Sequence, residues 1–433
     1  MTVTRRPGRA LVALVALVGM VLGACSSTVS SPVAVPADGR PVEDVTSRAL
    51  AYAPPMGWNS WNRFGCDIDE QLIRDQAEAM VRSGMREAGY YYVVVDDCWM
   101  APQRDAQGRL QPDPERFPSG MAALGEYVHR LGLGFGLYAS AGATTCTGLP
   151  GSFGYEEIDA RTFAEWGVDY LKYDYCDDGQ GTPPPPDPPA SERYDRMITA
   201  LRNTGRPVVV SVVEWGINQP WLWSRQVGGR LWRTTLDIKD NWDRVVEILD
   251  QQVGLEAYSG PGGWNDPDML EVGNGGMTVT EYRSHFSLWA LLNAPLMAGN
   301  DLVSMDEETR RILLNRELIE VNQDWGGIQG HKVRDDGDVE VWVKPMSDCS
   351  TVVVLFNRAE EPRTVTATVE EAKLPRSASY HVRDLWTGEE STTTGELRGE
   401  VEPHGVVVYR VTPDCHPWSA PTGRSGNGSP GNR

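Results

Sequence analysis

The sequence is poor in several features that mark particular classes of protein. It has six histidines and no C-x-x-C pair among its seven cysteines, so neither a metal-binding histidine cluster nor a zinc or redox cysteine pair is expected. Positive charge is also scarce, because 40 Lys and Arg residues face 60 Asp and Glu residues and leave a formal net charge of -20. That balance argues against nucleic acids and anionic membrane surfaces as partners. No metal and no cofactor is predicted.

The apolar run near the amino terminus, "LVALVALVGMVL", is short for a membrane span. It follows three arginines and therefore suits an export signal. It ends in Leu22-Gly23-Ala24-Cys25, which resembles the lipobox of bacterial lipoproteins. We therefore expect residues 1–24 to be a lipoprotein-type signal peptide and the membrane attachment to run through a lipidated Cys25. A simple secretory signal also ends in small residues, so a secreted protein is the alternative to a lipid-anchored extracytoplasmic one.

The composition predicts a globular protein with a flexible tether at its amino terminus and a disordered tail at its carboxyl terminus. Hydrophobic residues make up 40% and charged residues 23% of the 433 positions, which suits a large domain followed by a small one. The Ser-, Pro- and Ala-rich stretch at 25–50 predicts a flexible tether. Residues 415–433 have the composition of a disordered tail.

Strand-like and helix-like segments alternate between residues 51 and 327. One helix is predicted over 70–89, where Gly89 can end it, and the strand-like "YYYVVVDDCW" follows at 90–99. Repeated units of this kind imply parallel strands joined by right-handed crossovers. Over this length an eight-stranded (β/α)8 TIM barrel is the natural closure. The alternative is an open doubly wound sheet, but no glycine-rich phosphate fingerprint follows the first strand.

Charged residues recur where the apolar strand segments end. In "VDYLKYDYCD", at 168–177, Lys172 and Asp174 point to the same side of a strand, where charges are costly unless they are paired or used. A single acid could instead cap the next helix. In a barrel, however, the carboxyl ends of the strands converge on the face where active sites form. Four strands share this pattern, which predicts one acidic pocket; the other residues are Asp96, Asp97, Glu214 and Asp237.

After the barrel, residues 328–414 contain short alternating strands such as "HGVVVYRVTP", which predict an antiparallel β-sandwich.

The number of cysteines supports export to an oxidising compartment. If Cys25 is lipidated, six cysteines remain, and an even number in an oxidising compartment predicts three disulfides. Six cysteines allow 15 connectivities, so composition leaves the pairing open. A bond between Cys349 and Cys415 within the sandwich is plausible because they flank its strands.

Seven stretches occur in order along the chain: "PPMGWNSWNRFGC", "VVVDDCW", "RFPSGM", "GLGFGLYASAGATTCTGLPGSFGYEEIDA", "WGVDYLKYDYC", "WRTTLDIKDNW" and "GPGGWNDPDML". They resemble successive motifs of glycoside hydrolase family 27, the α-galactosidases or melibiases, and the resemblance runs from about residue 53 to 410. It implies a catalytic barrel with a carboxyl-terminal β-sandwich. It also implies retaining hydrolysis of terminal α-D-galactosyl residues from an oligo- or polysaccharide, without a cofactor.

The resemblance implies a role for individual residues. Asp174 matches the catalytic nucleophile and Asp237 the general acid/base. The positions that match sugar-binding residues are Trp61, Asp96, Asp97, Tyr138, Lys172, Glu214, Arg233, Asp266 and Met269. The implied disulfides are Cys66–Cys98 and Cys146–Cys176, which leaves Cys349 and Cys415 as the third pair.

A retaining glycosidase needs two carboxyl groups about 5–5.5 Å apart, one of which attacks the sugar while the other protonates the leaving oxygen. We expect Lys172 to keep Asp174 ionised, and neighbouring acids to help raise the pKa of Asp237. Alternatives within the family are an isomalto-dextranase, an α-N-acetylgalactosaminidase and a β-L-arabinopyranosidase. The Asp96-Asp97 pair favours a hexose with a 6-hydroxyl over arabinose. A non-catalytic carbohydrate-binding protein is less expected, because both carboxyl groups are present.

Three positions depart from the family pattern. Val213 stands where a cysteine is common, and its usual partner region, "GGRLW", lacks a cysteine too. Tyr175 replaces a common Asn or Gly beside the predicted nucleophile. Residues 179–191 form a proline-rich insertion, which is expected to lie near the site and could reshape its leaving-group side.

Overall fold

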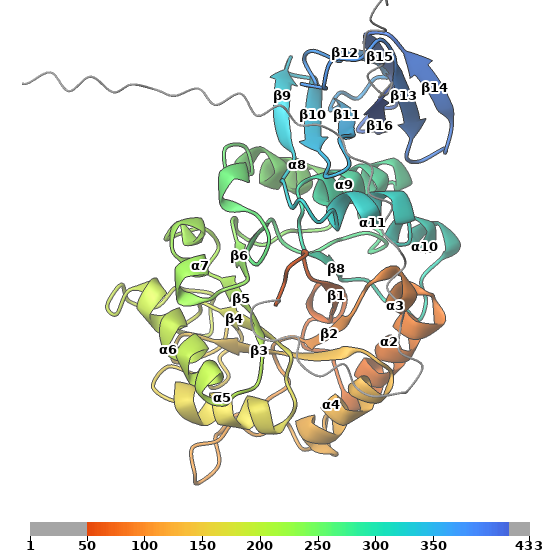
Figure 1. Ribbon diagram of the computed structural model, residues 1–433. Coiled ribbons are helices and arrows are strands. Elements are labelled where there is room, and N and C mark those ends of the chain that lie inside the picture. Colours follow the sequence, from red (N-terminus) through yellow and green to blue (C-terminus); the bar gives the residue numbers. More distant parts are fainter. Residues whose placement is uncertain (1–49, 415–433) are drawn as a thin grey trace, which may run out of the picture. The chain divides into compact units, whose positions relative to one another are not determined.

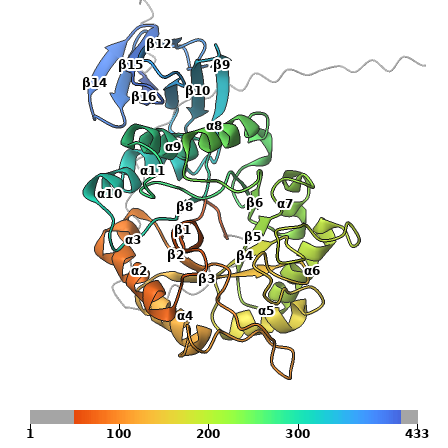
Figure 2. The same ribbon diagram turned by 180° about the vertical axis from the view of Figure 1, so that it is seen from behind.

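The alternation of strands and helices expected for residues 51–327 is present in the computed structural model, which describes residues 50–414 (Figures 1 and 2). The predictions for the signal peptide at 1–24, nearly all of the tether at 25–50 and the tail at 415–433 lie outside these residues. Within the described part of the chain, no helix is both long enough and apolar enough to cross a membrane.

Eight parallel strands form one sheet in the order β7-β6-β5-β4-β3-β2-β1-β8. A parallel bridge between Leu270, which follows β7, and Ala298 of β8 brings the two edges of the sheet together. The sheet is therefore curled into the predicted barrel, in which neighbours in sequence are neighbours in space. The strands are β1 (Met56–Asn59), β2 (Tyr92–Val95), β3 (Gly134–Ser140), β4 (Tyr170–Asp174), β5 (Val209–Val213), β6 (Leu231–Arg233), β7 (Trp264–Asp266) and β8 (Leu296–Ala298).

Helices connect the strands and lie outside the sheet (Figure 1). Asp69 caps the amino-terminal end of the helix that starts at Glu70, because its carboxylate accepts a hydrogen bond of 2.7 Å from the backbone N–H of Leu72. The single helix predicted over 70–89 is wrong. The chain forms two helices there, because Gly84 adopts a φ of 89° that a continuous helix does not allow, and Gly89 ends the second one. The helices are α1 (Trp61–Phe64), α2 (Glu70–Arg82), α3 (Met85–Ala88), α4 (Gly120–Arg130), α5 (Glu156–Glu165), α6 (Ala190–Asn203), α7 (Ser224–Val227), α8 (Trp242–Gln251), α9 (Val279–Leu291), α10 (Glu307–Leu313) and α11 (Arg316–Asn322), with short 3-10 turns at Pro220–Leu222 and Glu256–Tyr258.

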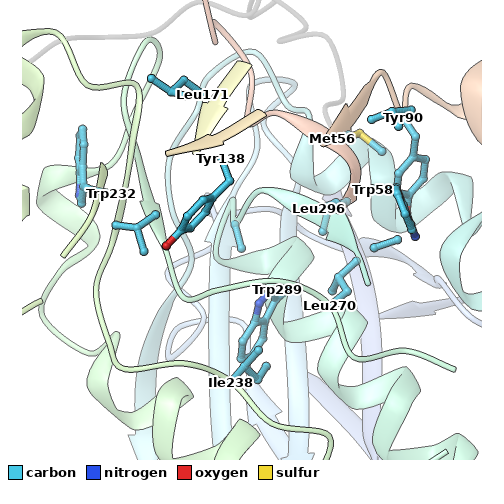
Figure 3. Close-up of a cluster of buried hydrophobic side chains, with 14 of the residues drawn as sticks. Met56, Trp58, Tyr90, Tyr138, Leu171, Trp232, Ile238, Leu270, Trp289 and Leu296 are labelled. Atoms are coloured by element: carbon cyan, nitrogen blue, oxygen red, sulfur yellow. The ribbon is translucent and has the colours of Figure 1, made fainter. Parts of the chain in front are cut away.

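Large side chains fill the space between the barrel and its helices (Figure 3). Trp58 and Trp289 are fully buried, and each indole N–H has a carbonyl partner: Trp58 donates to Asn300 O at 2.8 Å, and Trp289 donates to Asp268 O at 2.8 Å. A buried indole is stabilising when its N–H is satisfied. The bond from Trp289 also fixes the loop after β7, which carries part of the site described below.

The carboxyl-terminal strands form the predicted antiparallel sandwich. Six strands pair in the order β14-β13-β16-β11-β10-β9, and β12 pairs with β15. Alternate side chains of both sheets, such as Val353, Val365 and Leu397, share one apolar cluster. Cys349 precedes β11, but Cys415 lies outside the described residues, so their pairing stays a prediction. The strands are β9 (His331–Asp335), β10 (Val339–Pro345), β11 (Thr351–Asn357), β12 (Arg363–Thr368), β13 (Tyr380–Asp384), β14 (Glu390–Thr393), β15 (Glu396–Val401) and β16 (Val406–Pro413).

Helix α9 is buried on nearly all sides because both the barrel and the sandwich pack on it. Ser284 Oγ donates to the carbonyl of His404 at 2.7 Å, and the His404 ring contacts Glu281 Oε1 at 2.7 Å. Trp386 Nε1 donates to Ser287 Oγ at 3.0 Å. The sandwich thus supports the helix that follows the loop after β7.

Candidate active site

The carboxyl ends of the barrel strands surround a cavity of about 360 Å³. Polar and charged side chains make up most of its wall, as the pattern of charged strand ends predicts. Eight of the eleven residues predicted for catalysis and sugar binding line it. The residues that line the cavity are Trp61, Asn62, Arg63, Asp96, Asp97, Tyr138, Cys146, Lys172, Asp174, Arg233, Asp237, Ile238, Lys239, Asp240, Asp268, Glu271 and Asn274.

Lys172 and Asp96 form an ion pair at the cavity wall. The distance from Lys172 Nζ to Asp96 Oδ2 is 2.8 Å, and Asn59 Nδ2 donates to the same oxygen at 2.6 Å. Burial acts to lower the pKa of Lys172, but Asp96 and Asp174 outweigh it and raise that pKa. The lysine is therefore cationic, and its direct partner is Asp96.

Asp97 has a different environment from its neighbour. Its Oδ1 accepts from the backbone N–H of Cys98 at 2.7 Å, and its Oδ2 accepts from the N–H of Thr147 at 3.1 Å. Burial raises the pKa of Asp97, and the Asp96 charge adds to that effect. Adjacent carboxyl groups thus present one ion-paired acid and one acid held by backbone amides, which suits two different hydroxyl contacts.

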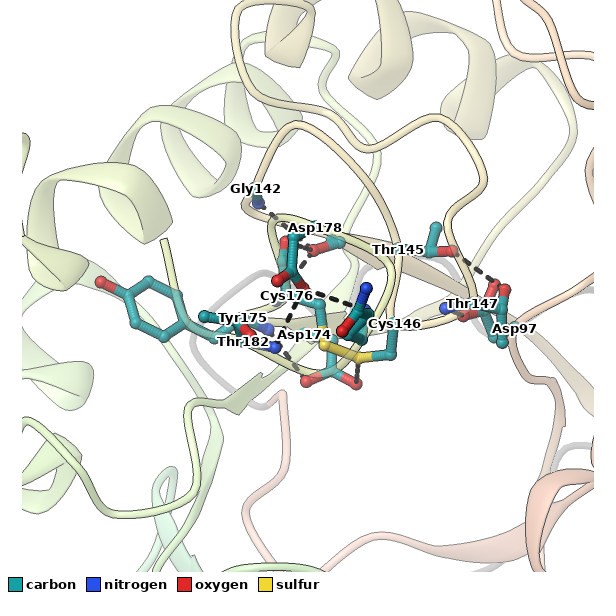
Figure 4. The surroundings of a disulfide bond; sticks show 12 residues. Asp97, Gly142, Thr145, Cys146, Thr147, Asp174, Tyr175, Cys176, Asp178 and Thr182 are labelled. Atoms are coloured by element: carbon teal, nitrogen blue, oxygen red, sulfur yellow. Dashed lines mark hydrogen bonds between the residues drawn. A yellow bond between two sulfur atoms is a disulfide. The ribbon is translucent and has the colours of Figure 1, made fainter. Parts of the chain in front are cut away.

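Asp174 is nearly buried at the end of β4, beside the Cys146–Cys176 disulfide (Figure 4). Its Oδ1 accepts from the N–H of Tyr175 at 2.9 Å, and its Oδ2 lies 3.4 Å from the Cys146 sulfur. Burial raises the pKa of Asp174 to about 7, although Lys172 acts to lower it. Lys172 thus acts in the expected direction, but burial outweighs it, so the lysine alone leaves Asp174 only partly ionised near neutral pH in the empty site.

Asp237 has the opposite setting. Its side chain is 62% exposed, and its Oδ1 lies 2.9 Å from Nη2 of the buried Arg233. Desolvation acts to raise the pKa of Asp237, but Arg233 and Lys172 outweigh it, so this pKa is lowered. The expectation that neighbouring acids raise it is wrong for the empty site, because the nearest charge is a guanidinium.

The two disulfides implied by the resemblance are present. Cys66–Cys98 links the loop after α1 to the residue that follows Asp97, and Cys146–Cys176 links the loops after β3 and β4. Both bridges thus join segments that carry residues of the cavity wall. Removing either one would loosen a loop next to a site carboxylate.

No thiolate metal site arises from this arrangement. Cys146, Asp174 and Cys176 are the one group with metal-ligand spacing among residues 50–414. The two sulfurs are bonded to each other, so they cannot act as thiolate ligands.

Tyr138 and Trp61 supply aromatic surface to the cavity. The Tyr138 hydroxyl lies 3.2 Å from the Cys146 sulfur, and its ring centroid lies 5.5 Å from Lys172 Nζ. The backbone N–H of Trp61 donates to Asn59 Oδ1 at 2.8 Å, which fixes the start of α1. An aromatic ring in such a wall suits the C–H face of a sugar.

Three predicted residues do not line this cavity. Glu214 is fully buried; its Oε2 accepts from the N–H and the side-chain amide of Asn218 at 2.7 and 2.9 Å. Burial raises its pKa to about 7. Asp266 and Met269 line a smaller, separate hollow inside the barrel, which also contacts Lys172.

Sequence reasoning missed Asp268, which lies two residues beyond Asp266 in the same "NDPDML" motif. Asp268 lines the cavity, its Oδ2 lies 2.9 Å from Arg233 Nη2, and the same oxygen accepts from the N–H of Ile238 at 2.8 Å. Its φ of 85° places it in the left-handed region, which is costly for a non-glycine residue and is common at functional sites. The motif held the signal, but strand alternation did not show which aspartate faces the cavity.

Glu271 was also missed. Its Oε1 accepts from Asn62 Nδ2 at 2.7 Å and its Oε2 from Asn274 Nδ2 at 2.6 Å, so it ties α1 to the loop after β7. Burial raises the pKa of Glu271 to about 7. No strand-end pattern could have found it, because it lies in a loop.

The insertion at 179–191 does not contribute a residue to the cavity wall. The buried Arg193 of α6 donates to the carbonyl oxygens of Pro185, Asp187 and Pro188 at 3.1–3.5 Å and to Ala141 O at 3.4 Å. The insertion is thus fastened to the end of β3 without reaching the cavity.

Two carboxyl groups in one cavity can act as a nucleophile and an acid/base at a glycosidic bond. Comparisons with known proteins agree with this chemistry. The family model described as "Alpha galactosidase A" matches residues 53–324, and that described as "Alpha galactosidase C-terminal beta sandwich domain" matches residues 336–411.

Relatives match nearly the whole described chain. An α-galactosidase of Cyamopsis tetragonoloba is 47% identical over 85% of this chain and 88% of its own length. α-Galactosidase A of Cellvibrio japonicus is 46% identical over 84% of this chain and 93% of its own. The crystal structure of α-galactosidase I from Mortierella vinacea superposes with a TM-score of 0.81 at 38% identity, covering 85% of this chain and 99% of that one. The chain belongs to the α-galactosidase family, glycoside hydrolase family 27.

Proposed function

We propose that the protein is a retaining exo-α-galactosidase that removes terminal α-D-galactosyl residues by double displacement. The observation that carries this proposal is that Asp174 and Asp237 line one cavity together with the Lys172–Asp96 pair and Asp97. Family membership supports the same activity. A carbohydrate-binding protein without catalysis would not need both carboxyl groups.

In the proposed reaction, Asp174 attacks the anomeric carbon while Asp237 gives its proton to the departing oxygen. The product of this step is a galactosyl ester of Asp174. A water molecule, which loses its proton to Asp237, then hydrolyses the ester and restores both groups. Each step inverts the anomeric carbon, so the overall outcome is retention.

The proton must lie on Asp237 at the start, whereas the opposite pKa shifts in the empty site place it on Asp174. A bound galactoside covers the exposed Asp237 carboxylate and removes water from it, which raises its pKa. Lys172 then stabilises the anionic form of Asp174. Substrate binding thus moves the shared proton to the group that needs it.

Sugar selectivity is proposed to rest on two contacts. Asp96 and Asp97 bind the 4- and 6-hydroxyls, which favours the axial O4 of galactose over glucose. Glu214 Oε1 is buried and has no hydrogen-bond partner among residues 50–414. Because Glu214 does not line the empty cavity, we propose that sugar binding shifts the loop after β5 and lets this oxygen accept from a 2-hydroxyl. Ile217, which is 52% exposed, adds bulk on the same loop. An acetamido group at carbon 2 would lose the acceptor pairing and clash.

The test is a panel of p-nitrophenyl glycosides. The α-galactoside should be cleaved about ten- to a hundredfold faster than the α-N-acetylgalactosaminide, since an unpaired buried acceptor costs roughly 1–3 kcal/mol. The α-glucoside and β-L-arabinopyranoside should also be poor substrates. Glu214→Ser combined with Ile217→Ala should narrow the gap to the acetamido sugar. Rapid release of isomaltose from dextran, with little galactose from melibiose, would replace this proposal with a dextranase.

We also propose a lipid anchor at Cys25, which the lipobox-like Leu22–Cys25 supports. Multiple acyl chains on that cysteine give stable membrane attachment. Mass spectrometry of the mature protein should find an acylated amino-terminal Cys25, and Cys25→Ser should shift the protein out of the membrane fraction or block its processing. An unmodified mature terminus at another residue would contradict the anchor and leave a secreted enzyme.

A further inference from the structure

The cavity continues past Asp237. Because Asp237 is proposed to protonate the glycosidic oxygen, the leaving group must begin beside it. The three residues that follow, Ile238, Lys239 and Asp240, line the same cavity, and so does Arg63 of α1. The N–H of Gly276 donates to Asp240, and Asn62 and Asn274 both donate to Glu271. These contacts hold α1 and the loop after β7 next to residues 238–240, so this part of the wall lies beside Asp237, where the leaving group has to begin.

The acids in this part of the wall already have partners. Both oxygens of Glu271 accept from asparagine side chains. Asp240 accepts from the Tyr282 hydroxyl at 2.8 Å and from the N–H of Gly276 at 2.5 Å. These carboxylates are therefore held in place and keep little capacity for a ligand.

The cations do not have partners. Among residues 50–414, the exposed side chains of Arg63 and Lys239 form no ion pair and no hydrogen bond, although the chain carries 60 acidic residues. Asn274 Oδ1 is buried without a hydrogen-bond partner, while its Nδ2 donates to Glu271. The wall thus offers two unused groups of donors and one unused acceptor.

We propose that Arg63, Lys239 and Asn274 form a second subsite that binds the hydroxyl groups of a sugar leaving group. This subsite rests on the proposed function, because Asp237 defines its position. The unused donors match hydroxyl oxygens, and Asn274 Oδ1 can accept from a hydroxyl. Ile238 is the one aliphatic residue among the described residues of the wall, so a lipid leaving group would find little apolar surface.

The test compares raffinose, whose leaving group is a sugar, with p-nitrophenyl α-galactoside, whose leaving group has no hydroxyls. The double variant Arg63→Met and Lys239→Met keeps most of the aliphatic stems and removes the charges. The ratio of kcat/KM for raffinose to that for the nitrophenyl substrate should fall about tenfold, because hydrogen bonds to charged groups are lost. Arg376→Met, which removes an exposed arginine of the sandwich, is the matched control and should leave the ratio unchanged.

An unchanged ratio in the double variant, or an equal loss on both substrates, would overturn the subsite. A binding measurement separates this failure from that of the proposed function. In an Asp174→Asn background, calorimetry should show raffinose binding weakened about tenfold by the two Met substitutions and methyl α-galactoside binding affected much less. If the wild-type enzyme cleaved neither substrate, the proposed function would fail. In the binding measurement, an equal loss of affinity for raffinose and for methyl α-galactoside would overturn the subsite even then.

Discussion

Asp174→Asn should lower kcat for α-galactosides about ten-thousandfold or more, the scale seen when a nucleophile is removed. An amide cannot form the galactosyl ester, but it is nearly isosteric, and its oxygen can still accept from the N–H of Tyr175. Release of nitrophenol and of galactose, measured over hours, gives the residual rate. Wild-type-like turnover by Asp174→Asn would contradict the double-displacement mechanism. A product of inverted anomeric configuration, seen by early-time NMR with the wild-type enzyme, would contradict it as well.

The same variant separates catalysis from folding. Burial raises the pKa of Asp174 to about 7 from an unfolded value near 3.8. The folded state therefore binds more protons between these two pH values, so this group costs stability as pH rises through that window, and the cost is complete above about pH 7. Asp174→Asn removes the buried charge, so its Tm should exceed that of the wild type at pH 8 by more than at pH 4. A variant less stable at both pH values would point to a structural loss instead.

The fold could be predicted from local patterns. Apolar strand segments followed by helical periodicity predict a parallel sheet with crossover helices, and the chain is long enough for that sheet to close into a barrel. The break between α2 and α3 at Gly84 could not be predicted from the sequence, since a glycine within a helical pattern is often tolerated. In the structure Gly84 adopts the left-handed conformation just before α3.

Site residues at strand ends could be predicted from the sequence, whereas those in loops could not. Lys172 and Asp174 follow from strand alternation. Asp268 and Glu271 do not, because the loop after β7 has no periodicity and its direction is fixed by contacts such as Trp289 Nε1 to Asp268 O. The directions of the pKa shifts could not be predicted from the sequence either, because they depend on distances between charged groups. Arg233 lies 2.9 Å from Asp237, so its positive charge lowers the pKa of Asp237 despite the many acidic residues nearby.

The contrast between Asp174 and Asp237 leads to the second large effect. Asp237→Asn should lower kcat/KM for raffinose about a hundred- to ten-thousandfold, the usual contribution of general acid catalysis. The loss on p-nitrophenyl α-galactoside should be much smaller, because nitrophenolate leaves without a proton. Arg233 keeps its contact with Asp268 at 2.9 Å in the variant, so the wall should stay in place. Equal losses on the two substrates would contradict the acid/base role.

The kcat/KM of the wild-type enzyme and that of Asp237→Asn should change with pH in opposite directions. Wild-type enzyme needs one proton on the carboxyl pair, and the last proton leaves at the higher of the pair's two values, about 7, so kcat/KM should fall above that pH. Asp237→Asn has only the nucleophile left to titrate. Its kcat/KM for the nitrophenyl substrate should therefore rise with pH as Asp174 ionises and then level off. The midpoint should lie below about 7, because the Asp237 charge that helps to raise the pKa of Asp174 is gone. A falling alkaline limb that persisted in the variant would assign that proton to another group, and Asp237 would lose its proposed role.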